Sequence, residues 1–180
     1  MSKIVVIYKS KYGYTKKYAE WIAQELDAAL FEHANIKPAQ LSEYDLVIYG
    51  GGLYAGGING IKIVTKNPCK ALIVFTVGLA DPKITDYTPV LEQSFTPEQL
   101  AGIKVLHLRG GVDYAKLGFI HKGLLAVVKK AADKKPLAER TSEDCAIIEA
   151  YGTQTDFTDK AALVPLIEYV RKELRMNACS

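Results

Sequence analysis

One short segment of this chain carries residues of the types that bind a phosphate group. Residues 10–15 read SKYGYT and directly follow an apolar run. A strand-to-helix turn there would leave backbone N–H groups free at the positive end of a helix dipole, which suits a phosphate. Ser10 and Thr15 add hydroxyl donors, and Gly13 allows close approach or a positive φ. Positive potential would come from Lys11, Lys16 and Lys17. The alternative is an ordinary helix with Thr15 as its N-cap.

A second segment, residues 50–57, reads GGGLYAGG and follows another apolar run. So many glycines predict either close approach of a flat ligand or a backbone that changes conformation. The segment fits the GxGxxG/A dinucleotide pattern formally, but no acidic residue ends the next strand, where a ribose partner belongs. Tyr54 is a candidate for stacking on an aromatic ligand. A half-buried packing role is the alternative for Tyr54.

The third segment, residues 76–82, reads TVGLADP and also follows an apolar run. Other phosphate and hydrolase signatures are missing from the sequence: it has no GxxxxGK[ST] pattern and no GxSxG elbow. Lys9 and Ser10 stand where a phosphoacceptor domain would carry acidic residues. The three histidines are isolated, and no cluster of His, Cys, Asp or Glu has the spacing of a metal site.

The elements that must position these segments follow from hydrophobic periodicity. Apolar runs predict strands at 3–9, 45–49, 71–76, 103–108 and 146–150, with a short edge strand within 29–36. Helical periodicity predicts helices at 15–30 and 158–175, the second with a threonine cap and an internal Pro165. Alternating strands and helices imply a parallel sheet covered on both faces. Ligands bind beyond the carboxyl ends of such strands, where all three segments would lie.

One stretch interrupts the alternation. Residues 116–135 predict a basic amphipathic helix, and the chain leaves the sheet after Leu108 and returns near Ala146. The apolar stripe of this helix is Leu117, Ile120, Leu124, Val127, Val128 and Ala131, surrounded by six lysines. We favour a helix that covers the sheet and keeps its lysines in solvent. Contact with a membrane surface is the alternative.

Length and composition limit the remaining possibilities. The 180 residues are 49% hydrophobic and carry a net charge of +3, which suits a single domain spanning 1–180 with an insertion at about 109–145. The weak, mixed charge does not indicate a nucleic-acid partner. No apolar run approaches the roughly 20 residues that span a bilayer, and no signal peptide is recognised, so we expect a cytoplasmic protein, with peripheral membrane contact as an option. Three distant cysteines are expected to be reduced bystanders.

Together the three segments resemble the flavodoxin family. SKYGYT at 10–15 looks like the family's hydroxyl-x-x-Gly-x-Thr phosphate loop, and YDLVIYG at 44–50 resembles the lead into the first loop that contacts the isoalloxazine ring. Residues 76–79 match the second such loop by their order. The resemblance implies an α/β, flavodoxin-like three-layer sandwich with a five-stranded parallel sheet in the order 2-1-3-4-5. It also implies FMN as cofactor, bound by Ser10, Lys11, Tyr12, Gly13, Tyr14, Thr15, Gly51, Gly52, Leu53, Tyr54, Ala55, Gly56, Thr76, Val77, Gly78 and Leu79.

Within the family, the chain is most similar to the menaquinone-dependent protoporphyrinogen oxidase-like branch. Residues 53–56 are similar to the branch's Arg-Tyr-Gly region, with Leu53 in place of the arginine, and residues 109–114 lie where it carries an Arg/Tyr-rich stretch. The helix at 116–135 resembles the long insertion that splits the fifth strand in that branch.

The resemblance implies a function in electron transfer. The first hypothesis is an FMN-dependent oxidoreductase that passes electrons between a small-molecule substrate and a quinone-type acceptor, with no catalytic side chain identified. The alternative is an electron carrier that docks on a redox partner protein, although carriers of this family are usually acidic and this chain is not. A further alternative is a flavin-free module that binds partners.

Overall fold

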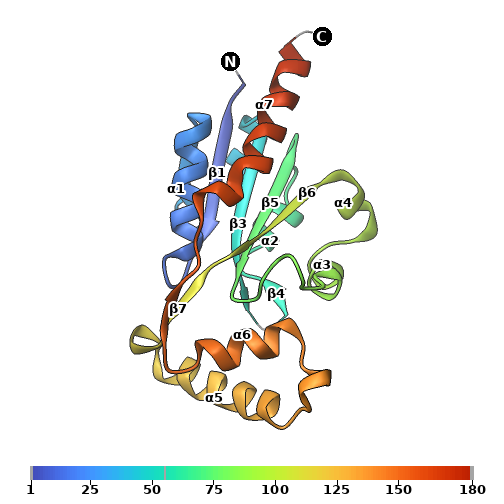
Figure 1. The fold of residues 1–180 in the computed structure, drawn as a ribbon. Coiled ribbons are helices and arrows are strands. Elements are labelled where there is room, and N and C mark those ends of the chain that lie inside the picture. Colours follow the sequence, from blue (N-terminus) through green and yellow to red (C-terminus); the bar gives the residue numbers. More distant parts are fainter. Residues whose placement is uncertain (1, 55, 179–180) are drawn as a thin grey trace.

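The computed structural model describes residues 2–54 and 56–178, and a parallel sheet forms its centre (Figure 1). The spatial order of the strands is β2-β1-β3-β5-β6, which is 2-1-3-4-5 in chain order and confirms the predicted order. Short β4 (Gly57–Ile58) pairs antiparallel with the end of β3. The five parallel strands are β1 (Ile4–Lys9), β2 (Ala29–Glu32), β3 (Leu46–Tyr54), β5 (Leu72–Gly78) and β6 (Lys104–Arg109).

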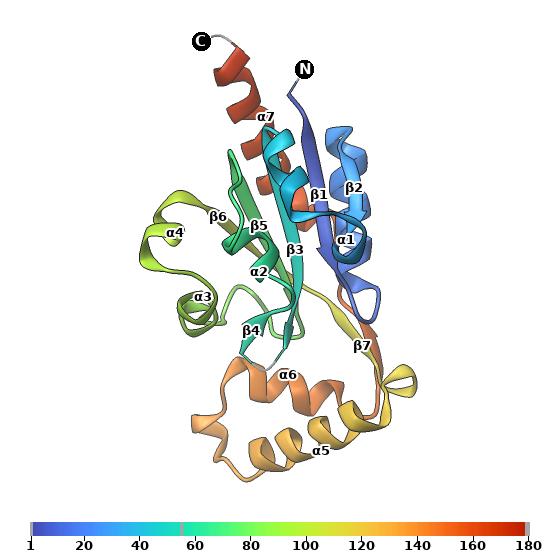
Figure 2. The same cartoon turned by 180° about the vertical axis from the view of Figure 1, so that it is seen from behind.

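Helices cover both faces of the sheet because successive strand residues point to opposite sides. On one face, α1 (Tyr14–Leu26) and α7 (Val164–Ala178) pack on a core that includes Val6, Ile48 and Phe75. On the other face, the core contains the alternate residues Val5, Val47 and Val74. The helices of this second face are α2 (Lys62–Thr65), α3 (Thr88–Ser94) and α4 (Pro97–Gly102), seen best from behind in Figure 2.

Strand β3 continues through the glycines that we expected to form a loop, so the predicted end at Tyr49 is wrong. Glycine is needed at these strand positions because any larger side chain would collide with neighbouring atoms. A Cβ on Gly50 would overlap the ring of buried Phe75, and a Cβ on Gly51 would lie 2.9 Å from the Asn59 carbonyl oxygen. The first two glycines of the cluster therefore serve packing within the sheet, and only the end of β3 is free to meet a ligand.

The strand predicted at 146–150 is wrong, because these residues lie in helix α6 (Ser142–Ala150). The apolar run AIIEA suggested a strand, but a capping box decides the structure: Thr141 Oγ1 accepts from the Asp144 N–H, and Asp144 accepts from the Thr141 N–H. The insertion also does not split the fifth strand. The chain passes from β6 into β7 (Gly111–Asp113), forms α5 (Phe119–Asp133) and α6, and returns as β8 (Gln154–Asp156), antiparallel to β7.

Two predicted helix boundaries are also wrong. Helix α1 ends at Leu26 because Asp27 adopts a left-handed conformation with φ 49°. Ala29 and Leu30, which we expected in the helix, belong to β2. Helix α7 begins at Val164, after a short 3-10 helix at Lys160–Leu163 whose N-cap is Asp159. Thr158 caps neither helix and bonds to other side chains.

Candidate functional site

The three predicted segments lie side by side at the carboxyl edge of the sheet. Strand β1 pairs with β2 on one side and β3 on the other, so the edge beyond β1 is the point where the strand order reverses. The register places Lys9 beside Gly51, and Gly51 beside Thr76. The structure therefore brings together the first turn at 10–15, the end of β3 and the end of β5.

The turn at residues 10–15 leaves the N-terminus of α1 open. Gly13 is the N-cap of α1 with φ +92°, and its N–H donates to Ser10 Oγ at 3.0 Å. Among the residues that the structure describes, no side chain caps α1, and the first helical turn contains no acidic residue. A Cβ on Gly13 would meet nothing within 4 Å, so the space in front of this turn is open. The first N–H groups of α1 can therefore take an anion.

Thr15 is not the N-cap of α1, so that alternative is wrong. It lies within the first helical turn, and it is buried. Its hydroxyl faces the end of β3, because a Cβ on Gly52 would lie 3.6 Å from Thr15 Oγ1. The Thr15 hydroxyl therefore lies beside the second segment.

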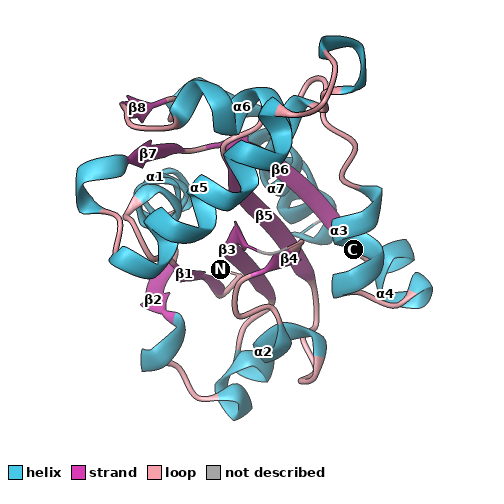
Figure 3. Cartoon of the chain, turned by 90° about the horizontal axis from the view of Figure 1, so that it is seen from below, coloured by secondary structure: helices cyan, strands magenta, loops and turns pink. Residues whose placement is uncertain are grey.

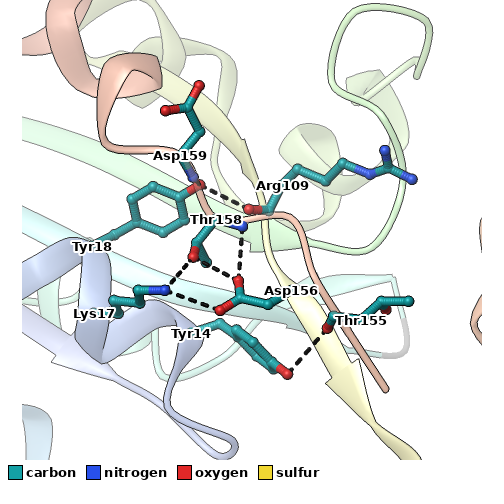
Figure 4. A network of polar contacts seen from close by, with 8 residues as sticks. All are labelled: Tyr14, Lys17, Tyr18, Arg109, Thr155, Asp156, Thr158 and Asp159. Carbon is teal, nitrogen blue, oxygen red and sulfur yellow. Dashed lines mark hydrogen bonds and ion pairs between the residues drawn. The ribbon is translucent and has the colours of Figure 1, made fainter. Parts of the chain in front are cut away.

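Each of the neighbouring lysines has a polar partner within the chain. Lys17 Nζ lies 3.0 Å from Asp156 Oδ2 and donates to Thr158 Oγ1 at 2.6 Å (Figure 4). Lys16 pairs with Glu20, and Lys11 Nζ lies 2.8 Å from His121 Nε2 in α5. The ion pairs of Lys16 and Lys17 reduce, but do not remove, the positive potential at this turn.

A polar network ties α1 to the returning chain, as Figure 4 shows. The Tyr18 hydroxyl donates to the Arg109 carbonyl at 2.8 Å and accepts from the Asp159 N–H at 3.0 Å. The Tyr14 hydroxyl donates to the Thr155 carbonyl at 3.3 Å. Burial alone would raise the pKa of Asp156, but hydrogen bonds from Thr158 and Lys17 outweigh it and hold this pKa below its usual value. The network keeps the start of α1 in place.

The end of β3 carries an aromatic side chain over the edge of the sheet. Tyr54 is 37% exposed, and its ring folds toward Gly52, where a Cβ would lie 2.8 Å from Tyr54 Cε2. Burial, with Tyr12 nearby, raises the pKa of Tyr54 to about 12. The Tyr12 hydroxyl is buried and has no hydrogen-bond partner among the described residues. An unsatisfied buried hydroxyl at this edge is the kind of group that a bound ligand would satisfy.

The remaining residues of the second segment differ in how they are placed. Ala55 lies outside the described residues. Gly56 has φ +77°, a conformation that favours glycine, beside the short pair of β3 and β4. Leu53 packs toward the third segment, because a Cβ on Gly78 would come within 3.0 Å of its Cδ1. Gly78 thus lets the second and third segments meet.

The third segment is partly interior. Thr76 is fully buried, and its Oγ1 lies 2.7 Å from His107 Nδ1 on β6, while Val77 belongs to the core. His107 stacks on Tyr87 with centroids 3.7 Å apart, and burial lowers the pKa of His107 to about 4. Sequence reasoning missed His107 and Tyr87, since nothing local marks a histidine whose neighbours come from another strand and a loop.

Arg109 links the third segment to the insertion, a role that the sequence did not reveal. Its Nε donates to the Leu79 carbonyl at 2.9 Å, and its guanidinium carbon lies 3.7 Å from the centre of the Phe157 ring. One of its nitrogens is 3.9 Å from Glu149 in α6. Arg109 therefore holds Leu79 and the α6 helix against the same edge of the sheet.

The α5–α6 hairpin, residues 119–150, lies across the carboxyl edge of the sheet (Figures 1 and 3). A small apolar cluster joins it to the site: Leu117 and Ala150 pack with Tyr12 of the first segment and Leu79 of the third. The expected sheet-covering position of the helix at 116–135 is thus wrong. The helix covers the ends of the strands, where a ligand would bind.

The strand order and the uncapped turn define an α/β protein of the flavodoxin-like class, with its site at the reversal of strand order. Residues 5–138 match the model of a family described as a flavodoxin domain, and the chain belongs to this family. The match begins within β1, at Val5, and includes the other four strands of the parallel sheet and helix α5.

Individual relatives are more distant. The chain is 32% identical over 82 residues to an uncharacterized protein of Methanocaldococcus jannaschii. The aligned region covers 42% of this chain and 55% of the relative, so the chain spans about half the length of that curated relative. The flavodoxin, WrbA-like protein from Agrobacterium tumefaciens is similar at 23% identity and TM-score 0.47, covering 61% of this chain and 83% of the other. A flavoprotein in complex with FMN from Lactobacillus acidophilus is similar at 18% identity and TM-score 0.41, covering 61% and 93%.

The described part of the chain contains neither a metal-binding cluster nor a membrane-spanning helix. Within residues 2–54 and 56–178, no three His, Cys, Asp or Glu side chains gather into a group that could hold a metal ion. The helices described there are too short or too polar to cross a bilayer. Cys69 and Cys145 are free thiols, and Cys179 lies outside the described residues.

Proposed function

We propose that this protein binds FMN at the carboxyl edge of its sheet and acts in electron transfer. The observation that carries the proposal is the uncapped start of α1 behind Gly13, at the point where the strand order reverses. Such a turn suits a phosphate monoester. Membership of the flavodoxin-domain family supports the same ligand.

The residues present at this edge fit the two ends of FMN. The phosphate would lie on the N–H groups of 10–15, with the Ser10 and Thr15 hydroxyls as further donors. The flat ring would lie between the end of β3, with Tyr54 and Gly56, and the end of β5, with Gly78 and Leu79. The buried Tyr12 hydroxyl would find a partner there. Bound FMN supplies one- and two-electron transfer, which belongs to the cofactor and not to the chain.

The chain's own residues would position the flavin and exclude water. Arg109 holds the Leu79 carbonyl, and the α5–α6 hairpin lies over the strand ends. Thr76 is fully buried and His107 partly so, which makes them a support for the β5 end that does not point into solvent. Exclusion of water strengthens every hydrogen bond to the flavin.

We further propose an oxidoreductase that passes electrons between a small substrate and a quinone-type acceptor, like the protoporphyrinogen oxidase-like branch. The net charge of +3 favours an enzyme over an electron carrier that docks on a basic partner, because such a carrier would need an acidic surface. Steady-state assays with protoporphyrinogen, quinones and NAD(P)H separate the two: turnover of a small substrate supports an enzyme. Exchange of electrons with partner proteins alone supports a carrier.

Reconstitution with FMN tests the cofactor proposal. The purified chain should take up FMN and show a flavin absorbance spectrum that is shifted from free FMN. Ser10→Ala and Thr15→Val should each weaken FMN binding by roughly 10–100-fold, since a hydrogen bond to a charged group contributes about 1.5–3 kcal/mol. Ser42→Ala, whose hydroxyl bonds only to the Ala39 carbonyl, is the matched control and should bind as the wild type does. A chain that takes up no FMN would leave the flavin-free module as the better account.

A further inference from the structure

The outward side of α5 is apolar, although nothing among the described residues covers it. Phe119, Ile120, Leu124 and Val127 are 94%, 83%, 56% and 67% exposed. Ile120, Leu124 and Val127, half of the predicted apolar stripe, are among the most exposed large hydrophobic side chains of the described chain. Single exposed apolar residues are common, but a row of four along one helix marks an interaction surface.

The packing of the opposite side sets which way this row points. His121 meets the Tyr12 ring edge to face at 6.0 Å, Leu125 joins the small apolar cluster, and Ala132 is fully buried. These residues recur at helical spacing, so one side of α5 is held against the rest of the molecule. The row from Phe119 to Val127 lies on the other side of the helix, where its side chains are exposed.

Positive charge accompanies the row. Residues 116–135 contain six lysines and one acidic residue, Asp133. Three of the lysines have acidic partners: Lys116 with Asp113, Lys129 with Asp133, and Lys135 with Asp144. Lys130 and Lys134 are exposed and form no ion pair among the described residues. The outer surface of α5 thus combines a row of large apolar side chains with uncompensated positive charge.

We propose that the outer surface of α5 docks on an anionic phospholipid membrane. A helix with an apolar side and lysines beside it lies in the interface plane, with apolar side chains among the acyl chains and cations near the headgroups. A second copy of this chain fits less well, because a two-fold contact through this surface would bring the same lysines together. The carboxyl edge of the sheet would then face the membrane, since the hairpin lies across that edge.

This proposal goes beyond flavin binding and does not depend on it, because the contacts that orient α5 are all made by the protein. The test is co-sedimentation of the full chain with vesicles of phosphatidylcholine alone or mixed with phosphatidylglycerol. We expect binding to the mixed vesicles that weakens with added salt, and much less binding to phosphatidylcholine alone.

Two double variants separate the apolar and charged contributions. Leu124→Ser/Val127→Ser and Lys130→Gln/Lys134→Gln should each weaken binding to the mixed vesicles about tenfold or more. Their matched controls are Ile84→Ser, at an exposed apolar residue outside α5, and Lys62→Gln/Lys66→Gln on α2, which should bind as the wild type does. Far-UV circular dichroism should be unchanged in all variants, because the replaced side chains are exposed.

Three outcomes would overturn the proposal: no binding to the mixed vesicles, equal binding by the α5 variants and the wild type, or equal binding to the two vesicle types. Sedimentation velocity covers the competing occupant. If the wild type dimerises and the Leu124→Ser/Val127→Ser variant is monomeric, the row is a contact between copies and not a membrane surface.

Discussion

Helices α1 and α5 have similar apolar stripes in the sequence but opposite positions in the fold. In α1, Tyr18 and Ile22 are fully buried against the sheet. In α5, Ile120 and Leu124 occur at the same helical spacing and face outward. The comparison shows that periodicity reports an apolar side of a helix but not what covers that side.

The different positions have a local cause. Helix α1 directly follows β1 and must cross back over the sheet to reach β2, which presses its apolar side onto the strands. Helix α5 follows β7, beyond the end of the sheet, and meets α6 and the strand ends instead. His121, Leu125 and Ala132 lie on the packed side of α5, whereas the row from Phe119 to Val127 remains exposed.

Truncating one isoleucine in each helix should give the largest difference in the free energy of unfolding between the two helices. Ile22→Ala should lower the free energy of unfolding by about 2–5 kcal/mol, since it opens a cavity in the core. Ile120→Ala should change that free energy by less than about 0.5 kcal/mol, as expected for an exposed site. Urea unfolding of the apoprotein, followed by circular dichroism, measures both. A loss of 2 kcal/mol for Ile120→Ala would mean that the outer side of α5 is covered within the chain.

Adding one methyl group in each region should give a smaller contrast of opposite sign. Gly50→Ala places a Cβ against the buried Phe75 ring and should destabilise by about 1–3 kcal/mol. Gly123→Ala, in the middle of α5 with no atom within 4 Å of the new Cβ, should stabilise by roughly 0.5–1 kcal/mol. Thermal unfolding of the two variants checks the signs. Two effects of the same sign would contradict the assigned packing of β3 or of α5.

Acidification should affect the two regions in separate pH ranges. His107 in the sheet titrates near 6.5 when unfolded and at about 4 when folded, so its stabilising contribution is complete above pH 6.5 and is lost as the pH falls toward 4. Asp144 in the hairpin has its pKa lowered chiefly by Lys135, so its contribution is lost only below its usual value of 3.8. Urea unfolding at several pH values should show that the free energy of unfolding of His107→Gln falls less than that of the wild type between pH 6.5 and 4. An unchanged slope would contradict the buried, neutral state of His107.

The parallel sheet could be predicted because its strands are buried on both faces and read as continuous apolar runs. The same rule failed at residues 146–150, where the capping contact between Thr141 and Asp144 outweighs local strand preference. It also failed at the glycines after Tyr49, because the need for glycine beside Phe75 arises from a neighbouring strand. The contact between Thr141 and Asp144 is local and the sequence carries its pattern, but the apolar run at 146–150 is the more conspicuous signal. The contact between Gly50 and Phe75 joins two strands, and no local pattern records it.

The site was predicted as three segments at one edge, and the structure brings those segments together. What could not be predicted is how each side chain is used within them. Lys17 turns to Asp156, Thr76 turns to His107, and Arg109 reaches back to Leu79. Each partner lies on an element whose position depends on the insertion or on sheet pairing. The partners of these side chains therefore follow only from the structure.

A comparison of FMN and riboflavin binding is the most direct test of the central claim that the chain binds FMN through its phosphate. If the FMN phosphate lies on the turn behind Gly13, as we propose, the chain should bind FMN at least about 100-fold more tightly than riboflavin, because riboflavin loses several charge-assisted hydrogen bonds. Fluorescence titration of each flavin with the apoprotein measures both dissociation constants. Equal affinities for the two flavins, or no affinity for either, would contradict the account.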